Sequence, residues 1–260
     1  MSTREQILHN LRVSLHSFGS VIDALTPDQW NAQSLCPAWT AHGVVAHTTA
    51  IEAALLGWRP DSPDNPFALM GPIAQELSGL SPAALRARFH EVVAARLLEL
   101  EAMSDDEFTA PSFTPVGQAT YARFMAIRVF DIWVHERDIR VPLDIPGDDG
   151  GPAAEMALDE VEGSIGYIAG KKIGVPDGQG LAFHLTGPVR RDIFVKVDGR
   201  AARVPELVDP DAVLTADSLT FVLLACGRIN PDEPIRDGRV AWSGDPALGE
   251  RAARNLAFTM

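Results

Sequence analysis

Three side chains on two predicted helices have the types and the spacing to hold a metal ion. Asp131 and His135 stand four residues apart in a segment, residues 120–140, that is apolar around most of its circumference. This pattern predicts a buried helix, and a turn of about 100° per residue puts the two side chains on one face. His47 falls on the apolar face of a second predicted helix, which follows Thr40. Two imidazoles and one carboxylate can act as the protein ligands of a catalytic zinc ion, with a position left for water or substrate.

The same residues also have plainer interpretations. A histidine on an apolar face is more often a hydrogen-bonded core residue than a ligand, and this applies to His47 taken alone. Asp131 and His135 could equally form a buried hydrogen-bonded couple. The spacing alone therefore leaves both interpretations open.

The sequence around these residues resembles a known family. Two segments carry the resemblance: residues 35–40, which read LCPAWT and precede His47, and residues 128–140, which read RVFDIWVHERDIR. Both resemble the mycothiol-dependent maleylpyruvate isomerase family, which joins a DinB-like metal-binding bundle to a C-terminal α+β domain similar to sterol-carrier proteins. Residues 223–228 (LLACGR) and 240–245 (VAWSGD) look like that second domain. The resemblance therefore spans essentially the whole chain.

The resemblance implies a metal site and a thiol cofactor. It assigns His47, Asp131 and His135 as ligands of a divalent metal, usually zinc, with Asp131 where the characterised isomerases have glutamate. The implied thiol is mycothiol. A thiolate can add to an electron-poor double bond, allow rotation about the resulting single bond and leave again, which is cis–trans isomerisation. A reaction that stops after addition or displacement would make the protein a thiol S-transferase.

Two arginines are the candidate catalytic residues outside the metal site. Arg128 shares the face of Asp131 and could hold a substrate carboxylate, or it could form a structural ion pair with Asp131 or Asp138. Arg228 resembles an arginine of the family's C-terminal domain that reaches the active site. Asp138 could orient His135, or it could pair with a nearby arginine.

The cysteines of the chain are not expected to take part in catalysis, because the implied nucleophile belongs to the thiol cofactor. Cys36 and Cys226 are the only two, which excludes a disulfide scaffold and any CxxC motif. Cys36 precedes a proline and is interpreted as a small buried hydrophobic residue rather than a reactive thiol.

The predicted elements place these residues in a helical bundle. Apolar periodicity predicts four helices in about 140 residues: 3–25, from Thr40 to near 57, from Ser81 to near 100, and 120–140. Residues 59–72 are proline-rich and predict a loop long enough to cover a pocket mouth.

A change of composition predicts the boundary between two domains. Residues 141–152 are rich in proline, glycine and aspartate, as linkers often are. We therefore expect a DinB-like four-helix bundle at residues 1–143 and a small α+β domain at 152–260. The second domain has predicted helices at residues 153–169, 218–226 and 246–258, and predicted strands at 181–185, 193–197, 212–214 and 239–242.

Composition narrows the class of protein. Asp and Glu number 35 against 22 Lys and Arg, a net charge of −13 that opposes binding to nucleic acid or to an anionic membrane. Neither a membrane-spanning apolar run nor a signal-peptide core is present, so a cytoplasmic location is expected. The GxGxxG, GxSxG and HExxH motifs are absent, which disfavours dinucleotide binding, serine hydrolysis and the common metalloprotease mechanism.

The leading interpretation is a metal-dependent enzyme that uses a low-molecular-weight thiol on a small electrophilic molecule. The alternatives are a hydrolase with a metal-activated water and a non-catalytic metal- or ligand-binding protein. A mononuclear iron oxygenase also fits two histidines and a carboxylate, but oxygenases with this ligand set present it from β-strands, which disfavours this alternative. The sequence specifies neither the electrophile nor the oligomeric state.

Overall fold

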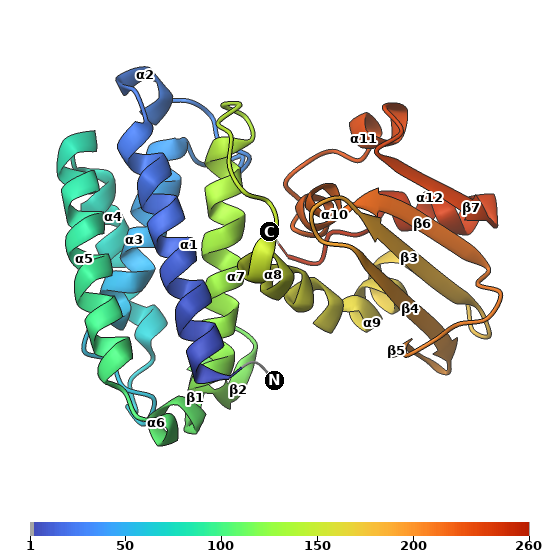
Figure 1. Ribbon diagram of the computed structural model, residues 1–260, viewed down its shortest axis with the longest axis horizontal. Helices are drawn as coiled ribbons and strands as arrows, with labels where there is room; N and C mark the ends of the chain where they lie inside the picture. The colour runs from blue at the N-terminus through green and yellow to red at the C-terminus, as the bar shows by residue number, and fades with distance from the viewer. Residues whose placement is uncertain (1–2, 260) are drawn as a thin grey trace. The chain divides into compact units, whose positions relative to one another are not determined.

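The computed structural model describes residues 3–259 and divides into two compact units. One unit ends at Gly147 and the other begins at Asp148. Figure 1 shows a bundle of long helices in the first unit and a sheet with helices in the second. The predicted fold class, a helical bundle followed by an α+β region, is confirmed. Within residues 3–259, no helix has both the length and the apolar character that crossing a membrane requires.

The first unit is built on four long helices. They are α1 (Arg4–Ala24), α3 (Ala41–Leu55), α5 (Pro82–Ala102) and α7 (Tyr121–Arg140). Helices α1 and α3 each pack against both α5 and α7. Helix α7 is buried along most of its length, as its apolar circumference predicts. Side chains on every side of the central part of α7 are therefore buried.

The starts of these helices follow from their capping residues. The Thr40 side chain accepts a hydrogen bond from the Gly43 backbone N–H, and the Thr120 side chain accepts one from Arg123. Ser81 caps α5 in the same way, with Pro82 at the first helical position. Each cap satisfies one of the backbone donors that a helix N-terminus leaves without a partner.

Several short elements between the long helices were not expected. The predicted loop at residues 59–72 contains η1 (Pro66–Leu69) and the start of α4 (Met70–Ser78). Proline is tolerated in the first turn of a helix because the backbone N–H groups there have no hydrogen-bond partner within the helix. The remaining short elements are α2 (Pro27–Trp30), α6 (Asp105–Thr109), β1 (Pro111–Thr114) and β2 (Gly117–Thr120). At four or five residues each, they are too short for a hydrophobic period to mark them.

The second unit is organised around a five-stranded sheet. Its strands are β3 (Gly180–Thr186), β4 (Arg191–Asp198), β5 (Arg200–Val204), β6 (Ala212–Asp217) and β7 (Val240–Gly244). Their order is β5-β4-β3-β6-β7, and only the β3–β6 pair is parallel. Alternate residues of β6 are buried, which is the pattern of a sheet covered on one face. The sequence predicted four of these strands and missed β5, which carries three arginine or alanine side chains at its centre rather than an apolar alternation.

Helices cover one side of this sheet. They are α8 (Gly151–Gly163), α9 (Ile165–Tyr167), the π-helical turn η2 (Ile168–Ile173), α10 (Ser218–Ala225), α11 (Asp232–Arg236) and α12 (Pro246–Arg254). Gly166 and Gly170 allow the α9–η2 segment to lie close to β5, because a Cβ at either position would come within 3.0 Å of Ala201. The helix predicted at 246–258 is too long, since α12 ends at Arg254. The helix predicted at 153–169 breaks at Ser164 and continues as a π-helical turn.

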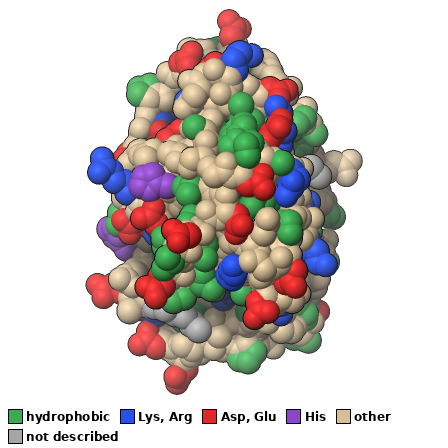
Figure 2. All heavy atoms as spheres, turned by 90° about the vertical axis from the view of Figure 1, so that its right-hand side faces the viewer, with side chains coloured by type: hydrophobic (Ala, Val, Ile, Leu, Met, Phe, Trp, Pro, Cys, Tyr) green, Lys and Arg blue, Asp and Glu red, His purple; other side chains and the backbone are tan. Residues whose placement is uncertain are grey.

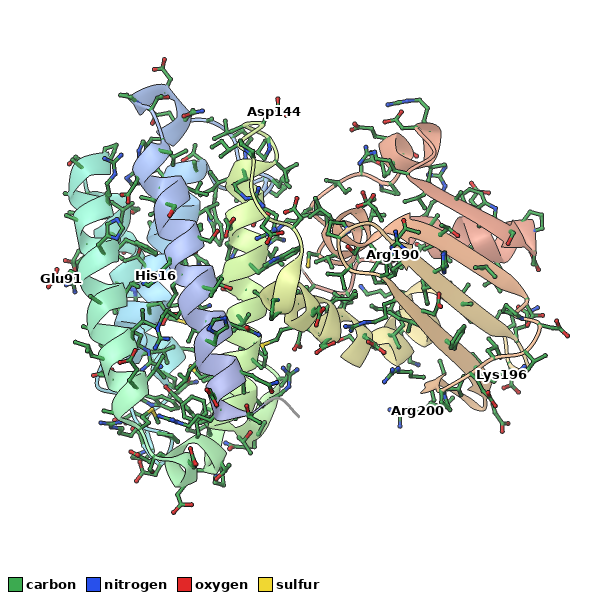
Figure 3. The ribbon with its side chains drawn as sticks, viewed as in Figure 1. His16, Glu91, Asp144, Arg190, Lys196 and Arg200 are labelled. Atoms are coloured by element: carbon green, nitrogen blue, oxygen red, sulfur yellow. The ribbon has the colours of Figure 1, made fainter. Side chains whose placement is uncertain are left out.

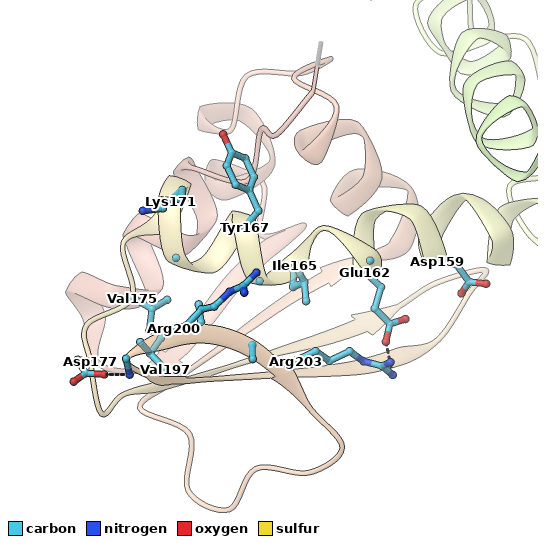
Figure 4. A pocket seen from close by; sticks show the side chains of 16 residues that line it. Asp159, Glu162, Ile165, Tyr167, Lys171, Val175, Asp177, Val197, Arg200 and Arg203 are labelled. Carbon is cyan, nitrogen blue, oxygen red and sulfur yellow. Dashed lines mark hydrogen bonds and ion pairs between the residues drawn. The ribbon is translucent and has the colours of Figure 1, made fainter. Parts of the chain in front are cut away.

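A cavity of about 980 Å³ lies within the second unit, between α8, α9 and the strands β4 and β5 (Figure 4). Glu162 forms an ion pair with Arg203 at 2.5 Å, and Asp177 accepts a hydrogen bond from the Gly199 backbone at 2.7 Å. None of the residues predicted to do chemistry lines this cavity.

The surface carries charges of both signs. On the face shown in Figure 2, acidic and basic side chains are interspersed with hydrophobic ones. Glu91 on the bundle and Arg190 and Arg200 on the second unit, all labelled in Figure 3, are exposed. The net charge of −13 is thus not accompanied by a basic stretch on that face.

We expect brief digestion with subtilisin to cut first between Val141 and Ala153, because residues 145–150 form neither helix nor strand. Two protease-resistant fragments should accumulate, and mass spectrometry identifies them. If the β1–β2 hairpin or the sheet is cut first while residues 141–153 stay intact, the expectation of two separately folded domains is wrong.

Candidate active site

The structure brings the three predicted ligand side chains together at the middle of α3 and α7. One ligand atom from each of His47, Asp131 and His135 lies within 4.8 Å of the other two. The His135 Nε2 atom is 3.6 Å from Asp131 Oδ1, and the two imidazole rings are 5.0 Å apart between centroids. The predicted convergence of two helices on one point is therefore present in the geometry.

His135 is held by a hydrogen bond on its far nitrogen. Its Nδ1 lies 2.8 Å from Oδ2 of Asp138, whose side chain is fully buried. When Nδ1–H donates to this carboxylate, the Nε2 lone pair is directed toward Asp131 and His47. Asp138 therefore orients His135, which is one of the two roles predicted for it.

Cys36 supports the same carboxylate from a different part of the chain. Its Sγ lies 3.0 Å from Oδ2 of Asp138 and donates to it, and the Leu35 backbone N–H donates to the Asp138 carbonyl at 2.9 Å. Cys36 is buried, as predicted, but it is more than a filler of apolar space. With His135 and Asp138 it forms a second group of adjacent ligand-type atoms.

Asp131 is ionised by its surroundings. Burial disfavours its charged form, but the positive charge of Arg128, together with His135 and His47, outweighs burial and lowers the pKa of this carboxyl to about 2. The Arg128 guanidinium contacts Oδ2, while Oδ1 faces His135. The carboxylate is therefore charged at neutral pH, as a metal ligand must be.

Arg128 is itself paired with a carboxylate on α3. Its Nε donates to Oε1 of Glu52 at 2.9 Å, and its Nη2 lies 2.8 Å from the same oxygen. Burial alone would lower the pKa of Arg128, but Asp131 and Glu52 outweigh burial and raise it. Of the two roles predicted for Arg128, the structure shows an ion pair with Asp131, and it adds Glu52 as a second partner.

The ion pairs continue to α5. Glu52, which has no exposed surface, lies 3.5 Å from Nε of Arg96, and Arg96 in turn contacts Tyr121 and Glu99. Three helices are joined in this way by one buried network. The sequence analysis missed Glu52, although a single carboxylate inside the apolar run TTAIEAALL was a signal that could have found it.

A cavity of about 290 Å³ opens beside the three predicted ligands. Its polar lining consists of His47, Arg128 and Asp131, and its apolar lining of Ile51, Phe67, Met70, Pro115, Phe124 and Ile127. Phe67 and Met70 come from the segment predicted to cover a pocket mouth. Trp39 lies next to the site, with its ring 4.5 Å from that of His47.

Arg228 lies in the second unit, just after α10. Its Nη1 donates to the Cys226 carbonyl at 3.0 Å, and its backbone N–H donates to the Leu223 carbonyl at 2.8 Å. Within this unit, Arg228 therefore donates hydrogen bonds to carbonyl groups at the C-terminal end of α10.

Two family models match the chain. Residues 11–140 match the mycothiol maleylpyruvate isomerase N-terminal domain. Residues 155–251 match the C-terminal domain of the same family. The chain belongs to the mycothiol maleylpyruvate isomerase family. No curated protein sequence matches it closely.

Solved structures of this family have the same fold. The mycothiol-dependent maleylpyruvate isomerase matches with a TM-score of 0.59 and 19% identity, over 88% of this chain and 93% of its own. A variant of that isomerase with one histidine replaced by alanine matches with a TM-score of 0.60 and 18% identity, over 94% of this chain and 96% of its own. A structure from outside this family, sterol carrier protein 2 like 2 from Aedes aegypti, matches 38% of this chain and 93% of its own, with a TM-score of 0.29 and 12% identity.

We expect Glu52→Ala to lower the free energy of unfolding by about 3 kcal/mol, because the change leaves two buried guanidinium groups short of a carboxylate. Glu101→Ala is the control: Glu101 is half exposed and also pairs with an arginine, so its loss should cost less than about 1 kcal/mol. Urea unfolding followed by circular dichroism measures both values. Equal costs for the two variants would show that the buried network does not stabilise the bundle.

Proposed function

We propose that this chain is a metal-dependent enzyme that uses a low-molecular-weight thiol, mycothiol by family, to isomerise a small electrophile. His47, Asp131 and His135 are the proposed ligands of a divalent metal, with zinc as the first candidate. The observation that carries the proposal is the approach of their three ligand atoms to within 4.8 Å of one another, in a family whose solved member is a mycothiol-dependent maleylpyruvate isomerase.

The surroundings of these residues fit a metal. Nδ1 of His135 is engaged by Asp138, so Nε2 remains as the coordinating nitrogen. Asp131 is ionised and directs one oxygen to the same point. A divalent ion at this position would supply the positive charge that lowers the pKa of an incoming thiol.

The reaction itself requires little covalent chemistry from the chain. A bound thiolate would add to one carbon of the double bond while the π electrons move onto the conjugated carbonyl oxygen. After rotation about the new single bond, the double bond would re-form as the carbon–sulfur bond breaks, which would regenerate the thiolate. The 290 Å³ cavity holds the electrophile beside the ligands, and its buried walls, Phe124 and Ile127, keep water out.

Neither cysteine is placed to serve as the nucleophile. Cys36 is absent from the lining of the cavity and donates its thiol proton to Asp138. Cys226 is buried in the second unit, after α10. The two proposed catalytic arginines differ in position: Arg128 lines the cavity as part of an ion-pair network, and Arg228 belongs to the second unit.

We expect His47→Ala to weaken the binding of one divalent ion at least tenfold, because one of three protein ligands is lost. His16→Ala, on the exposed face of α1 (Figure 3), is the control and should bind metal as the unmodified protein does. A competition titration against a chelating dye measures the affinity, and circular dichroism confirms that both variants stay helical. If the two variants bind metal equally well, His47 is not a ligand.

We expect turnover of a cis-enone only when a thiol is added. Cys36→Ala and Cys226→Ala should keep this activity within about tenfold, whereas His135→Ala should lose it. Product analysis distinguishes the trans isomer from a stable thioether, and so isomerisation from S-transfer. Turnover without added thiol would favour the hydrolase instead, and turnover that persists without added thiol but is lost in Cys36→Ala would make an internal cysteine the nucleophile.

A further inference from the structure

Residues 33–40, the pre-α3 segment, are held in place by hydrogen bonds within the segment itself. The Gln33 side-chain amide donates to the backbone carbonyls of Cys36 and Trp39, at 2.8 and 2.9 Å. The Ser34 hydroxyl donates to the Trp39 carbonyl at 2.7 Å and accepts from the Cys36 backbone N–H at 3.1 Å. Because its backbone groups are satisfied in this way, the segment presents Cys36 and Trp39 from fixed positions.

Two contacts join the pre-α3 segment to the last turn of α7. The Asp138 carbonyl would pair within the helix with the residue four positions on, but that residue is Pro142, which has no N–H. The Leu35 backbone N–H donates to this carbonyl instead, at 2.9 Å. The Cys36 thiol donates to Oδ2 of the Asp138 side chain at 3.0 Å, and the same oxygen lies 2.8 Å from Nδ1 of His135. Since Asp138 and Cys36 are both buried, little water competes for this oxygen.

Trp39, from the same segment, lies against the other histidine. The ring centroids of Trp39 and His47 are 4.5 Å apart, and the ring planes meet at 32°. Gly43 stands one turn before His47 on α3, and a Cβ there would lie 3.0 Å from the Cβ of Trp39. The absent side chain at Gly43 therefore leaves space for Trp39 on the side of α3 that carries His47. The indole restricts the rotation of the His47 ring.

We propose that the pre-α3 segment positions both imidazoles of the candidate metal site. Cys36 is the positioning residue for His135 and acts through Asp138. Trp39 is the positioning residue for His47 and acts by direct contact. A metal ion needs ligand atoms aimed at one point, so loss of either contact weakens its binding. The effect on metal binding rests on the proposed function, whereas the orientation of the two rings does not.

Titration of the chelator-treated protein with cobalt(II) alone tests the Cys36 contact. Cys36→Ala should weaken binding about tenfold and alter the visible absorption of the bound ion, which reports its coordination geometry. Cys36→Ser should restore binding to within about threefold, because a hydroxyl can donate to the same carboxylate. Ala38→Ser, at an exposed position of the same segment, is the matched control and should change neither affinity nor spectrum.

Two results would overturn the role of Cys36. One is an affinity and spectrum in Cys36→Ala that equal those of the unmodified protein, or a Cys36→Ser variant that behaves as Cys36→Ala does. The other is an intense near-ultraviolet sulfur-to-cobalt band that disappears in Cys36→Ala, because Cys36 would then bind the ion itself.

The Trp39 contact is tested with two substitutions of different ring content. Trp39→Leu should weaken cobalt(II) binding about tenfold, and Trp39→Phe, which keeps a ring beside His47, should weaken it about threefold. Circular dichroism checks that both variants keep their helices, as expected for a side chain that is only half-buried. Equal losses in the two variants, or no loss in Trp39→Leu, would show that the ring contact does not position His47.

NMR of the metal-free protein, labelled with 15N in its histidines, separates this proposal from the proposed function. At alkaline pH, where imidazoles are neutral, His135 should be a single tautomer with its proton on Nδ1, and Cys36→Ala should give a mixture of both tautomers. If this change is seen but the unmodified protein binds no cobalt(II), the proposed function fails and the positioning role stands. If cobalt(II) binds equally to all variants and His135 keeps one tautomer, the positioning role fails and the proposed function stands.

Discussion

The structure of the first unit depends on the pairing of charge inside the bundle. Glu52, Arg96 and Arg128 are all nearly inaccessible to water, and their burial is tolerable because Glu52 lies within ion-pair distance of both arginines. These residues come from α3, α5 and α7, so the pairing sets how those helices align with one another. The same pairing reaches Asp131 through Arg128 and fixes which of its oxygens faces the histidines. Helix register and the orientation of Asp131 are therefore set by one network.

His135 is fixed by an independent set of contacts. Asp138 lies one turn further along α7 and holds Nδ1, and the segment before α3 reaches the same carboxylate through Cys36. The two candidate ligands on α7 are thus held from opposite ends: Asp131 by a cation and His135 by an anion. Asp138 lies outside the cavity lining, so the orientation of His135 does not depend on what fills the cavity, whereas Arg128, which holds Asp131, is part of that lining.

The sequence predicted those parts of the site that depend on interactions between residues close together in the chain. Helix starts can be predicted at Thr40, Ser81 and Thr120 because a capping side chain binds a backbone N–H only three residues further on. The shared face of Asp131 and His135 can be predicted because residues four apart lie on one side of a helix. Glu52 was missed because its partners lie on other helices, which no periodicity encodes. The wall formed by Phe67 and Met70 was foreseen only as a proline-rich covering segment, since helices of fewer than ten residues carry too few turns to reveal which side faces a cavity.

The cavity is built from parts of two kinds. The candidate ligands stand on the long, buried helices α3 and α7, whereas Phe67, Met70 and Pro115 come from η1, the start of α4 and the β1–β2 turn, which lie outside the four main helices. Short connecting segments tolerate substitution and changes of length far better than a charged bundle interior does. A lineage with this fold can therefore acquire a new substrate by altering its connecting segments alone, and its reactive centre is inherited unchanged. In such a lineage, a change of substrate would be seen as sequence changes in these connecting segments, and a change of reaction would be seen as sequence changes in the helices.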